Sequence, residues 1–148
     1  MTDGTPQLPI GDDLLLSDGD SNSRVLICSI YEDQRPLKGT AGALDWRLRG
    51  FLSRFLKGGR INGKQDELVY IPFEHHGSMR HLLLVGLGPV HGSKDLNEKF
   101  SAALLKRVSS TVENMSFKRV AISRSSFPFL SESLVKKTLS GVEVEFTQ

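Results

Sequence analysis

The sequence predicts an α/β protein, in which helices cover the faces of a central β-sheet. Two runs of strand length, residues 25–31 (VLICSIY) and 81–87 (HLLLVGL), are almost wholly apolar, as expected of strands that are covered on both faces. Two other segments carry apolar residues at helical spacing. Strands and helices alternate along the chain, which is the pattern of a sheet packed against helices.

The composition is that of a single globular domain. The chain has 148 residues, the usual length of one domain. Its one cysteine, Cys28, excludes an internal disulfide framework and a multi-cysteine zinc site. The longest apolar run, residues 82–87, is far shorter than the about 20 residues that cross a bilayer. Residues 1–20 carry no Lys or Arg, unlike a secretory signal. We therefore expect a cytoplasmic protein.

The charge divides the chain into two parts. Residues 1–23 contain five Asp and no Lys or Arg, so with a net charge of +2 for the whole chain, residues 24–148 carry a modest positive balance of +7. We expect residues 1–23 to be a loose acidic segment with at most a short edge strand at 14–16, and residues 24–148 to form the domain. The positive balance permits an acidic partner such as nucleic acid but does not require one.

The first helical segment follows the strand at 25–31 and a polar turn at 32–36. Its apolar residues fall on one stripe of a helical wheel, and Gly58 and Gly59 end the segment. This pattern predicts one continuous helix, with a buried face that includes Leu48, Phe51 and Phe55.

The remaining elements follow in order along the chain. Residues 68–72 predict a short strand, and a polar hairpin-like loop at 74–80 leads to the strand at 81–87. A second helix is predicted to begin at Asp95, with Glu98 completing a capping box. A strand at 119–123, a short helix ended by Gly141 and a strand at 142–146 complete the chain.

A glycine-rich turn at residues 86–92 joins the second apolar strand to the second helix. Backbone amides and a helix N-terminus at such a place can bind phosphate. The candidate anion-binding residues are Gly86, Gly88, Gly92 and Ser93. The spacing matches neither a dinucleotide fingerprint nor a P-loop, and Pro89 lacks an N–H group. The alternative is a tight strand-to-helix turn without a ligand.

The other polar residues form no catalytic or metal-binding pattern. His75, His76, His81 and His91 lack the spacing of a zinc site, and we expect exposed loop histidines. The acidic stretch 18–22 lacks the glycine and the final glutamate of a calcium loop. We expect Cys28 to be a buried small hydrophobic residue. The sequence therefore predicts no metal and no cofactor.

The only tryptophan, Trp46, is a candidate interface residue. On the wheel of the first helix it lies opposite the apolar stripe, beside Gly50 and flanked by Arg47 and Arg54. Exposed Trp with Arg neighbours is typical of residues that anchor protein interfaces. The alternative is that the acidic segment or another helix covers the indole.

Several motifs occur in the order found in a known family. They are GTAGALD at 39–45, GFLSRFL at 50–56, NGKQ at 62–65, a strand ending in Ile71 and Pro72, and RHLLLVGLG at 80–88. From about residue 25 to 144 the chain resembles the N-terminal domain of the leucyl aminopeptidases, hexameric two-metal exopeptidases. The resemblance implies a macro-domain-like, three-layer α/β/α sandwich with a mixed central sheet. It also implies a non-catalytic domain, because the family's metal ligands and its NTDAEGR motif belong to a separate C-terminal domain.

The expected function is therefore protein interaction, regulation or oligomer assembly, with a protein partner or a second copy of the chain. Two alternatives stay open. The macro-domain resemblance suggests nucleotide or ADP-ribose binding near Glu32, Asp33 and the glycine-rich turn, although the glycine loops of ligand-binding macro domains have no clear match. Some aminopeptidase relatives also bind DNA, which leaves nucleic-acid binding as the other alternative.

Overall fold

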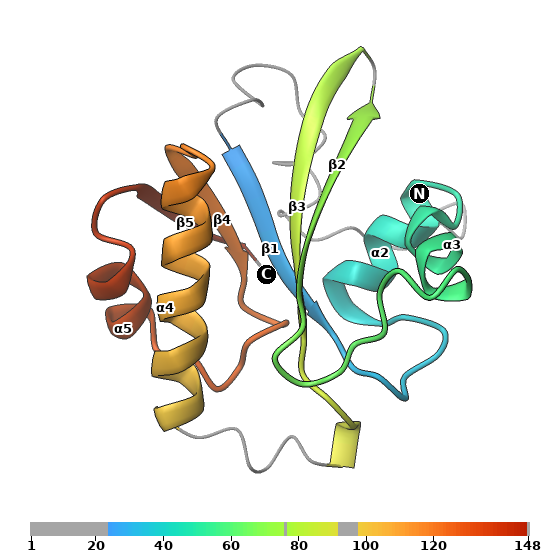
Figure 1. The fold of residues 1–148 in the computed structure, drawn as a ribbon, viewed down its shortest axis with the longest axis horizontal. Helices are drawn as coiled ribbons and strands as arrows, with labels where there is room; N and C mark the ends of the chain where they lie inside the picture. The colour runs from blue at the N-terminus through green and yellow to red at the C-terminus, as the bar shows by residue number, and fades with distance from the viewer. Residues whose placement is uncertain (1–23, 76, 92–97, 148) are drawn as a thin grey trace, which may run out of the picture.

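The computed structural model describes residues 24–75, 77–91 and 98–147, which form a five-stranded sheet and four helices (Figure 1). The elements, in chain order, are β1 (Arg24–Ile30), α2 (Gly39–Arg47), α3 (Phe51–Lys57), β2 (Leu68–His75), β3 (Ser78–Gly86), α4 (Glu98–Asn114), β4 (Arg119–Ser123), α5 (Glu132–Thr138) and β5 (Glu143–Thr147). Within these ranges no helix is both long and apolar enough to cross a membrane.

The sheet is mixed, with the strand order β2-β3-β1-β4-β5. Strand β2 pairs antiparallel with β3, and the other three pairings are parallel. Helices α2 and α3 lie on one side of the sheet, and α4 and α5 lie on the other (Figure 1). The predicted three-layer α/β/α sandwich with a mixed sheet is confirmed.

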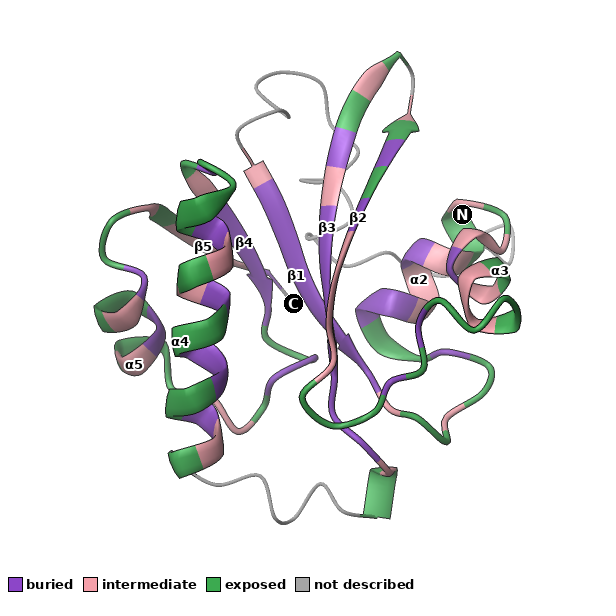
Figure 2. Cartoon of the chain, viewed as in Figure 1, coloured by how far each residue is buried: buried purple, intermediate pink, exposed green. Residues whose placement is uncertain are grey.

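Each face of the sheet has its own hydrophobic core. The first core lies against α4 and α5 and includes Val25 and Ile27, while the second lies against α2 and α3 and includes Leu26 and Cys28. Alternate residues of β1 thus enter opposite cores. Both faces of β1 are buried (Figure 2), which explains why its sequence is apolar without alternation.

The predicted single helix between residues 44 and 56 is wrong, because the chain bends between Arg47 and Phe51. Arg49 and Gly50 have φ angles of 56° and 81°, and two successive left-handed residues end a right-handed helix. The carboxylate of Asp45 then accepts a hydrogen bond from the Ser53 amide at 2.9 Å, in the first turn of α3. Two short helices result, and each turns its own face to the sheet.

The bend changes which side chains are buried. Leu44 and Leu52 are fully buried in the second core. Leu48, Phe51 and Phe55, which were predicted to be buried, are only half-buried and pack against the edge of that core. A wheel drawn for one straight helix placed them on the buried face, but the reversal at residues 49–50 changes the orientation of α3.

The other element boundaries differ by a few residues. Strands β2 and β3 extend into the predicted loop, so that His75 pairs with Ser78 across a tight hairpin. Strand β4 has the predicted bounds, and α5 ends before Gly141. The predicted helix start at Asp95 and the possible strand at 14–16 lie outside the described residues.

Candidate functional site

The loops that follow β1, β3 and β4 meet at the carboxyl edge of the parallel strands, at the bottom of the sheet in Figure 1. In doubly wound α/β folds, ligands bind at this edge, where neighbouring strands lead to helices on opposite faces. Here that point lies between β1, which leads to α2 on one face, and β4, which leads to α5 on the other.

A cluster of buried hydroxyl groups fills the space between these two strand ends. The hydroxyls of Thr40 and Ser123 lie 2.6 Å apart, and the Ser126 hydroxyl donates to Ser123 at 3.1 Å. The Ser29 hydroxyl donates to the Ser126 carbonyl at 2.8 Å. These bonds join β1, β4 and the first turn of α2. The cluster was not predicted from the sequence, although Ser29 near the end of the apolar run 25–31 and Ser123 at the end of the predicted strand 119–123 were visible signals.

A small cavity lies beside this cluster, at the carboxyl ends of β4 and β5. Its volume is about 120 Å³, and its lining includes Ser123, Phe127 and the ion-paired side chains of Arg124 and Glu132. Sites for drug-sized molecules and cofactors usually measure about 300 Å³ or more. This cavity is too small to accept a nucleotide without rearrangement.

The glycine-rich turn uses its amides within the fold. Gly86 donates to the Glu67 carbonyl and Gly88 to the Gly63 carbonyl, both at 2.8 Å. A Cβ atom on Gly86 would lie 2.1 Å from the Lys64 carbonyl oxygen, and Gly88 has a φ of +79°. The tight-turn alternative therefore accounts for both glycines. Gly92 and Ser93, the other two candidate anion-binding residues, lie outside the described part of the chain.

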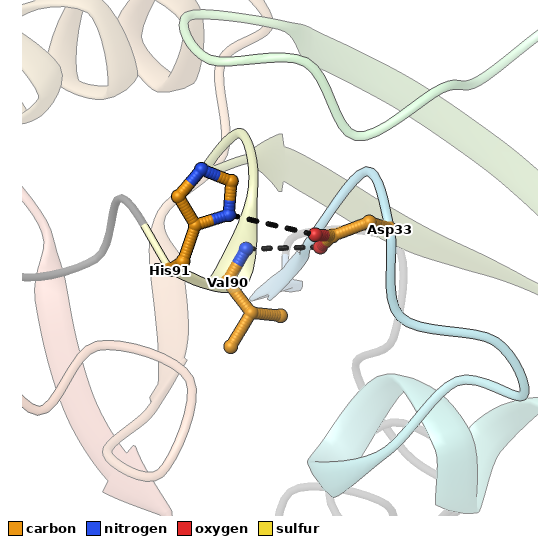
Figure 3. Close-up of polar contacts among 3 residues, drawn as sticks. All are labelled: Asp33, Val90 and His91. Carbon is orange, nitrogen blue, oxygen red and sulfur yellow. Dashed lines mark hydrogen bonds and ion pairs between the residues drawn. The ribbon is translucent and has the colours of Figure 1, made fainter.

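A third backbone amide of the same turn donates a hydrogen bond to a carboxylate. Asp33, in the loop after β1, accepts a hydrogen bond from the Val90 amide at 2.9 Å, and its other oxygen lies 4.0 Å from Nδ1 of His91 (Figure 3). Asp33 is one of the two acidic residues near which the sequence left nucleotide or ADP-ribose binding open. In the structure it places negative charge where a phosphate would approach this amide.

The histidines were predicted to be exposed loop residues, and for two of them this prediction is wrong. His91 is exposed, but His75 lies in β2 and His81 in β3, while His76 lies outside the described residues. Nδ1 of His81 is 2.7 Å from the Tyr70 hydroxyl, and its ring meets Phe117 edge-on at 4.9 Å. Burial lowers the pKa of His81.

Two further observations bear on chemistry. Cys28 is fully buried, and burial raises the pKa of its thiol to about 12, so this thiol stays protonated and is no nucleophile. Among the residues that the structure describes, no three His, Cys, Asp or Glu side chains gather into a group that could hold a metal ion.

The four candidate interface residues lie together at the bend between α2 and α3. Trp46 is 52% exposed, Arg47 and Arg54 are exposed, and Gly50 is half-buried. The Arg49 amide donates to the Trp46 carbonyl, and Nη1 of Arg54 donates to the Arg49 carbonyl at 2.8 Å. The helical wheel does not extend past the bend, yet the bend itself keeps these residues adjacent.

The positive charge of the chain is concentrated in the segment that contains this bend. Residues 35–64 contain eight Lys and Arg against one acid, Asp45, which gives a net charge of +7. The Asp45 carboxylate accepts a hydrogen bond from the Ser53 amide at the start of α3. We call Trp46 and these eight exposed cations the basic surface: Arg35, Lys38, Arg47, Arg49, Arg54, Lys57, Arg60 and Lys64. A charge count by segment could have found it from the sequence.

Fold and sequence comparisons agree on the class of this domain. It is a three-layer α/β/α domain, and residues 26–127 match the model of the N-terminal domain of the cytosol aminopeptidase family. The chain therefore belongs to that family, through its N-terminal domain.

A solved structure has the same fold. A lysine-to-glutamate mutant of tomato leucine aminopeptidase superposes with a TM-score of 0.56 at 18% sequence identity. The match covers 84% of this chain and 29% of the tomato chain. At this identity the likeness establishes the fold alone, and the chain spans less than a third of the length of the tomato protein.

Proposed function

We propose that this domain is a non-catalytic module that contacts another protein through the basic surface. The observation that carries the proposal is the 52% exposure of Trp46 within a segment, residues 35–64, whose net charge is +7. Trp and Arg dominate the residues that contribute most to binding at protein interfaces. The partner surface is acidic and is part of another protein or of a second copy of this chain.

The contact can be tested with one matched pair of variants. Trp46→Ala should weaken self-association or partner capture and leave the melting temperature nearly unchanged. Met79→Ala, which truncates another exposed apolar side chain on the β2–β3 hairpin, should change neither. Sedimentation equilibrium and thermal unfolding give the two readouts. A lower melting temperature with unchanged association would show that Trp46 serves the fold and would contradict the proposed contact.

The non-catalytic part of the proposal is supported by the match to the family's N-terminal domain. A cytoplasmic location belongs to the same proposal. The purified chain should not hydrolyse a chromogenic leucine substrate in the presence of manganese or zinc. Turnover that persists after contaminating peptidases are removed would overturn this assignment.

Nucleic-acid binding is the second candidate, because the +7 charge of residues 35–64 would also suit a phosphate backbone. Binding of a single-stranded oligonucleotide, measured against salt concentration, tests it. Tight binding that falls steeply with salt and is lost in Arg47→Gln with Arg54→Gln would favour this candidate. ADP-ribose binding has less support, because the amides of Gly86, Gly88 and Val90 are all engaged within the fold.

A further inference from the structure

We infer that the acidic segment of this chain, residues 1–23, binds the basic surface within the same molecule and competes with outside partners for it. This inference rests on the proposed function, since it names what regulates the proposed contact. It assigns the segment a role in regulation rather than that of a passive extension.

The acidic segment and the basic surface carry opposite charge. Residues 1–23 contain five Asp and no base, and residues 35–64 carry +7. Apart from these two segments, the positive and negative charges of the chain cancel. The two strongest charge blocks are thus opposite in sign and lie close in sequence. Opposite potentials on two surfaces attract and fix which surfaces pair.

A row of arginines lies on the face of the sheet that carries α2 and α3. Arg24 of β1 lies opposite Arg119 of β4 in the parallel register. The β1–β3 register begins at Leu26 and Leu82, and extending it by two residues places Arg80 opposite Arg24. Each arginine comes two residues before a member of the second core, so all three belong to that face. Glu145 already pairs with Arg119 at 3.2 Å. Arg24 and Arg119 are half-buried and Arg80 is buried, so the row places positive charge at the amino end of β1, where the acidic segment joins the domain.

The acidic segment has enough residues to reach the basic surface. The acidic segment joins the domain at Arg24, inside this arginine row. Twenty-three extended residues span roughly 75 Å at about 3.3 Å each, while a domain of this size has a radius of gyration of only about 15 Å. The segment can therefore reach every part of the basic surface. Its covalent link raises the effective concentration of the segment at this surface, to about millimolar for a short link, which favours binding within one molecule over an external acidic partner of equal affinity.

The chain offers a direct measurement. Trp46 is the only tryptophan, and the only cysteine, Cys28, is buried. A naphthalene-sulfonate fluorophore attached through Ser17→Cys, in the full-length chain, would accept energy from Trp46. We expect efficient transfer that does not depend on protein concentration. It should fall by about half when the salt is raised until the screening length drops from about 30 Å to about 3 Å.

Matched charge variants complete the experiment. Asp12→Asn, Asp13→Asn and Asp18→Asn together should lower the transfer to its high-salt value. Glu74→Gln, Glu113→Gln and Glu143→Gln, which remove the same charge from exposed positions of the domain, should leave it unchanged. The first set should also strengthen binding of a Glu-rich peptide to the basic surface, since the competing segment is weakened.

Three outcomes would overturn the inference. Energy transfer that changes neither with salt nor with the Asp→Asn substitutions would show that the segment does not bind the basic surface. Transfer that appears only as concentration rises would show that the segment binds a second copy. Equal effects of both variant sets would show a response to net charge alone. In each case a loss of association in Trp46→Ala would still uphold the proposed function, so the two can fail separately.

Discussion

The carboxylate of Asp33 accepts a hydrogen bond from the backbone amide of Val90 at 2.9 Å, across 57 residues of sequence (Figure 3). This bond joins the loop after β1 to the turn after β3, beside the bond from the Glu32 amide to the Gly88 carbonyl at 3.0 Å. The two loops are therefore joined at the carboxyl edge of the sheet, and the Asp33 carboxylate lies at this junction.

Asp33→Ala should lower the free energy of unfolding by about 1 kcal/mol, as expected for a hydrogen bond at a partly exposed site. Asp33→Asn should cost less, because the amide oxygen can still accept the bond from Val90. Urea unfolding measures both, with Glu32→Gln as the neighbouring control. An Asp33→Ala variant as stable as the wild type would show that the turn is held by other contacts.

The same carboxylate should keep phosphate groups away from the turn. We expect no measurable heat when ADP-ribose is added to the wild-type chain in a calorimeter, since the amides nearby are already bonded. Asp33→Ala frees the Val90 amide and should bind ADP-ribose better than Glu32→Gln does. Micromolar affinity in the wild type would contradict the interaction-module proposal in favour of a ligand-binding one.

The bend between α2 and α3 predicts an order of stability losses. Leu52→Ala should cost about 2–5 kcal/mol, because it empties a fully buried site. Phe51→Ala should cost less, since Phe51 is half-buried and packs its ring against Phe55 and Phe73 with centroids 5.0 and 5.3 Å away. Denaturant midpoints compare the two. The reverse order would mean that the straight-helix assignment was correct.

His81 should make the domain less stable in mild acid. Burial lowers its pKa from the ordinary value of 6.5, so the unfolded chain binds a proton more readily than the folded one. Its contribution to stability is therefore complete above pH 6.5 and is lost as the pH falls through the lowered folded value. His81→Phe should flatten the melting temperature between pH 7.5 and pH 5, whereas substitution of the exposed His91 by Gln should not. Identical profiles for wild type and His81→Phe would exclude this role.

Cys28 should be inert in the native state. Its thiol has a pKa raised to about 12 by complete burial, and only the thiolate reacts readily. Ellman's reagent at pH 8 should therefore leave the native chain unmodified and modify one thiol per chain in guanidinium chloride. Rapid native labelling would show that β1 opens often, and it would also remove the basis for site-specific labelling through Ser17→Cys.

The sequence alone predicted those features that depend on the residues of a single element and on how that element is buried. The unbroken apolar run of β1 predicted a strand buried on both faces, and Val25 and Leu26 do enter opposite cores. The glycines at 86 and 88 were compatible with a tight turn, which the structure shows. The alternation of strands and helices indicated a layered α/β fold. The order of short motifs indicated the family, which the match at residues 26–127 confirms.

Only the tertiary structure decided how distant segments meet. A helical wheel assumes that residues 44–56 form one straight helix. The spacing of the apolar residues does not indicate the left-handed residues Arg49 and Gly50, where the chain bends. Likewise, no local pattern shows that Asp33 lies against Val90 or that Thr40 lies against Ser123. Periodicity in a sequence reports how one element faces its surroundings. Contacts between polar groups on different elements depend on the path of the whole chain, which packing in three dimensions determines.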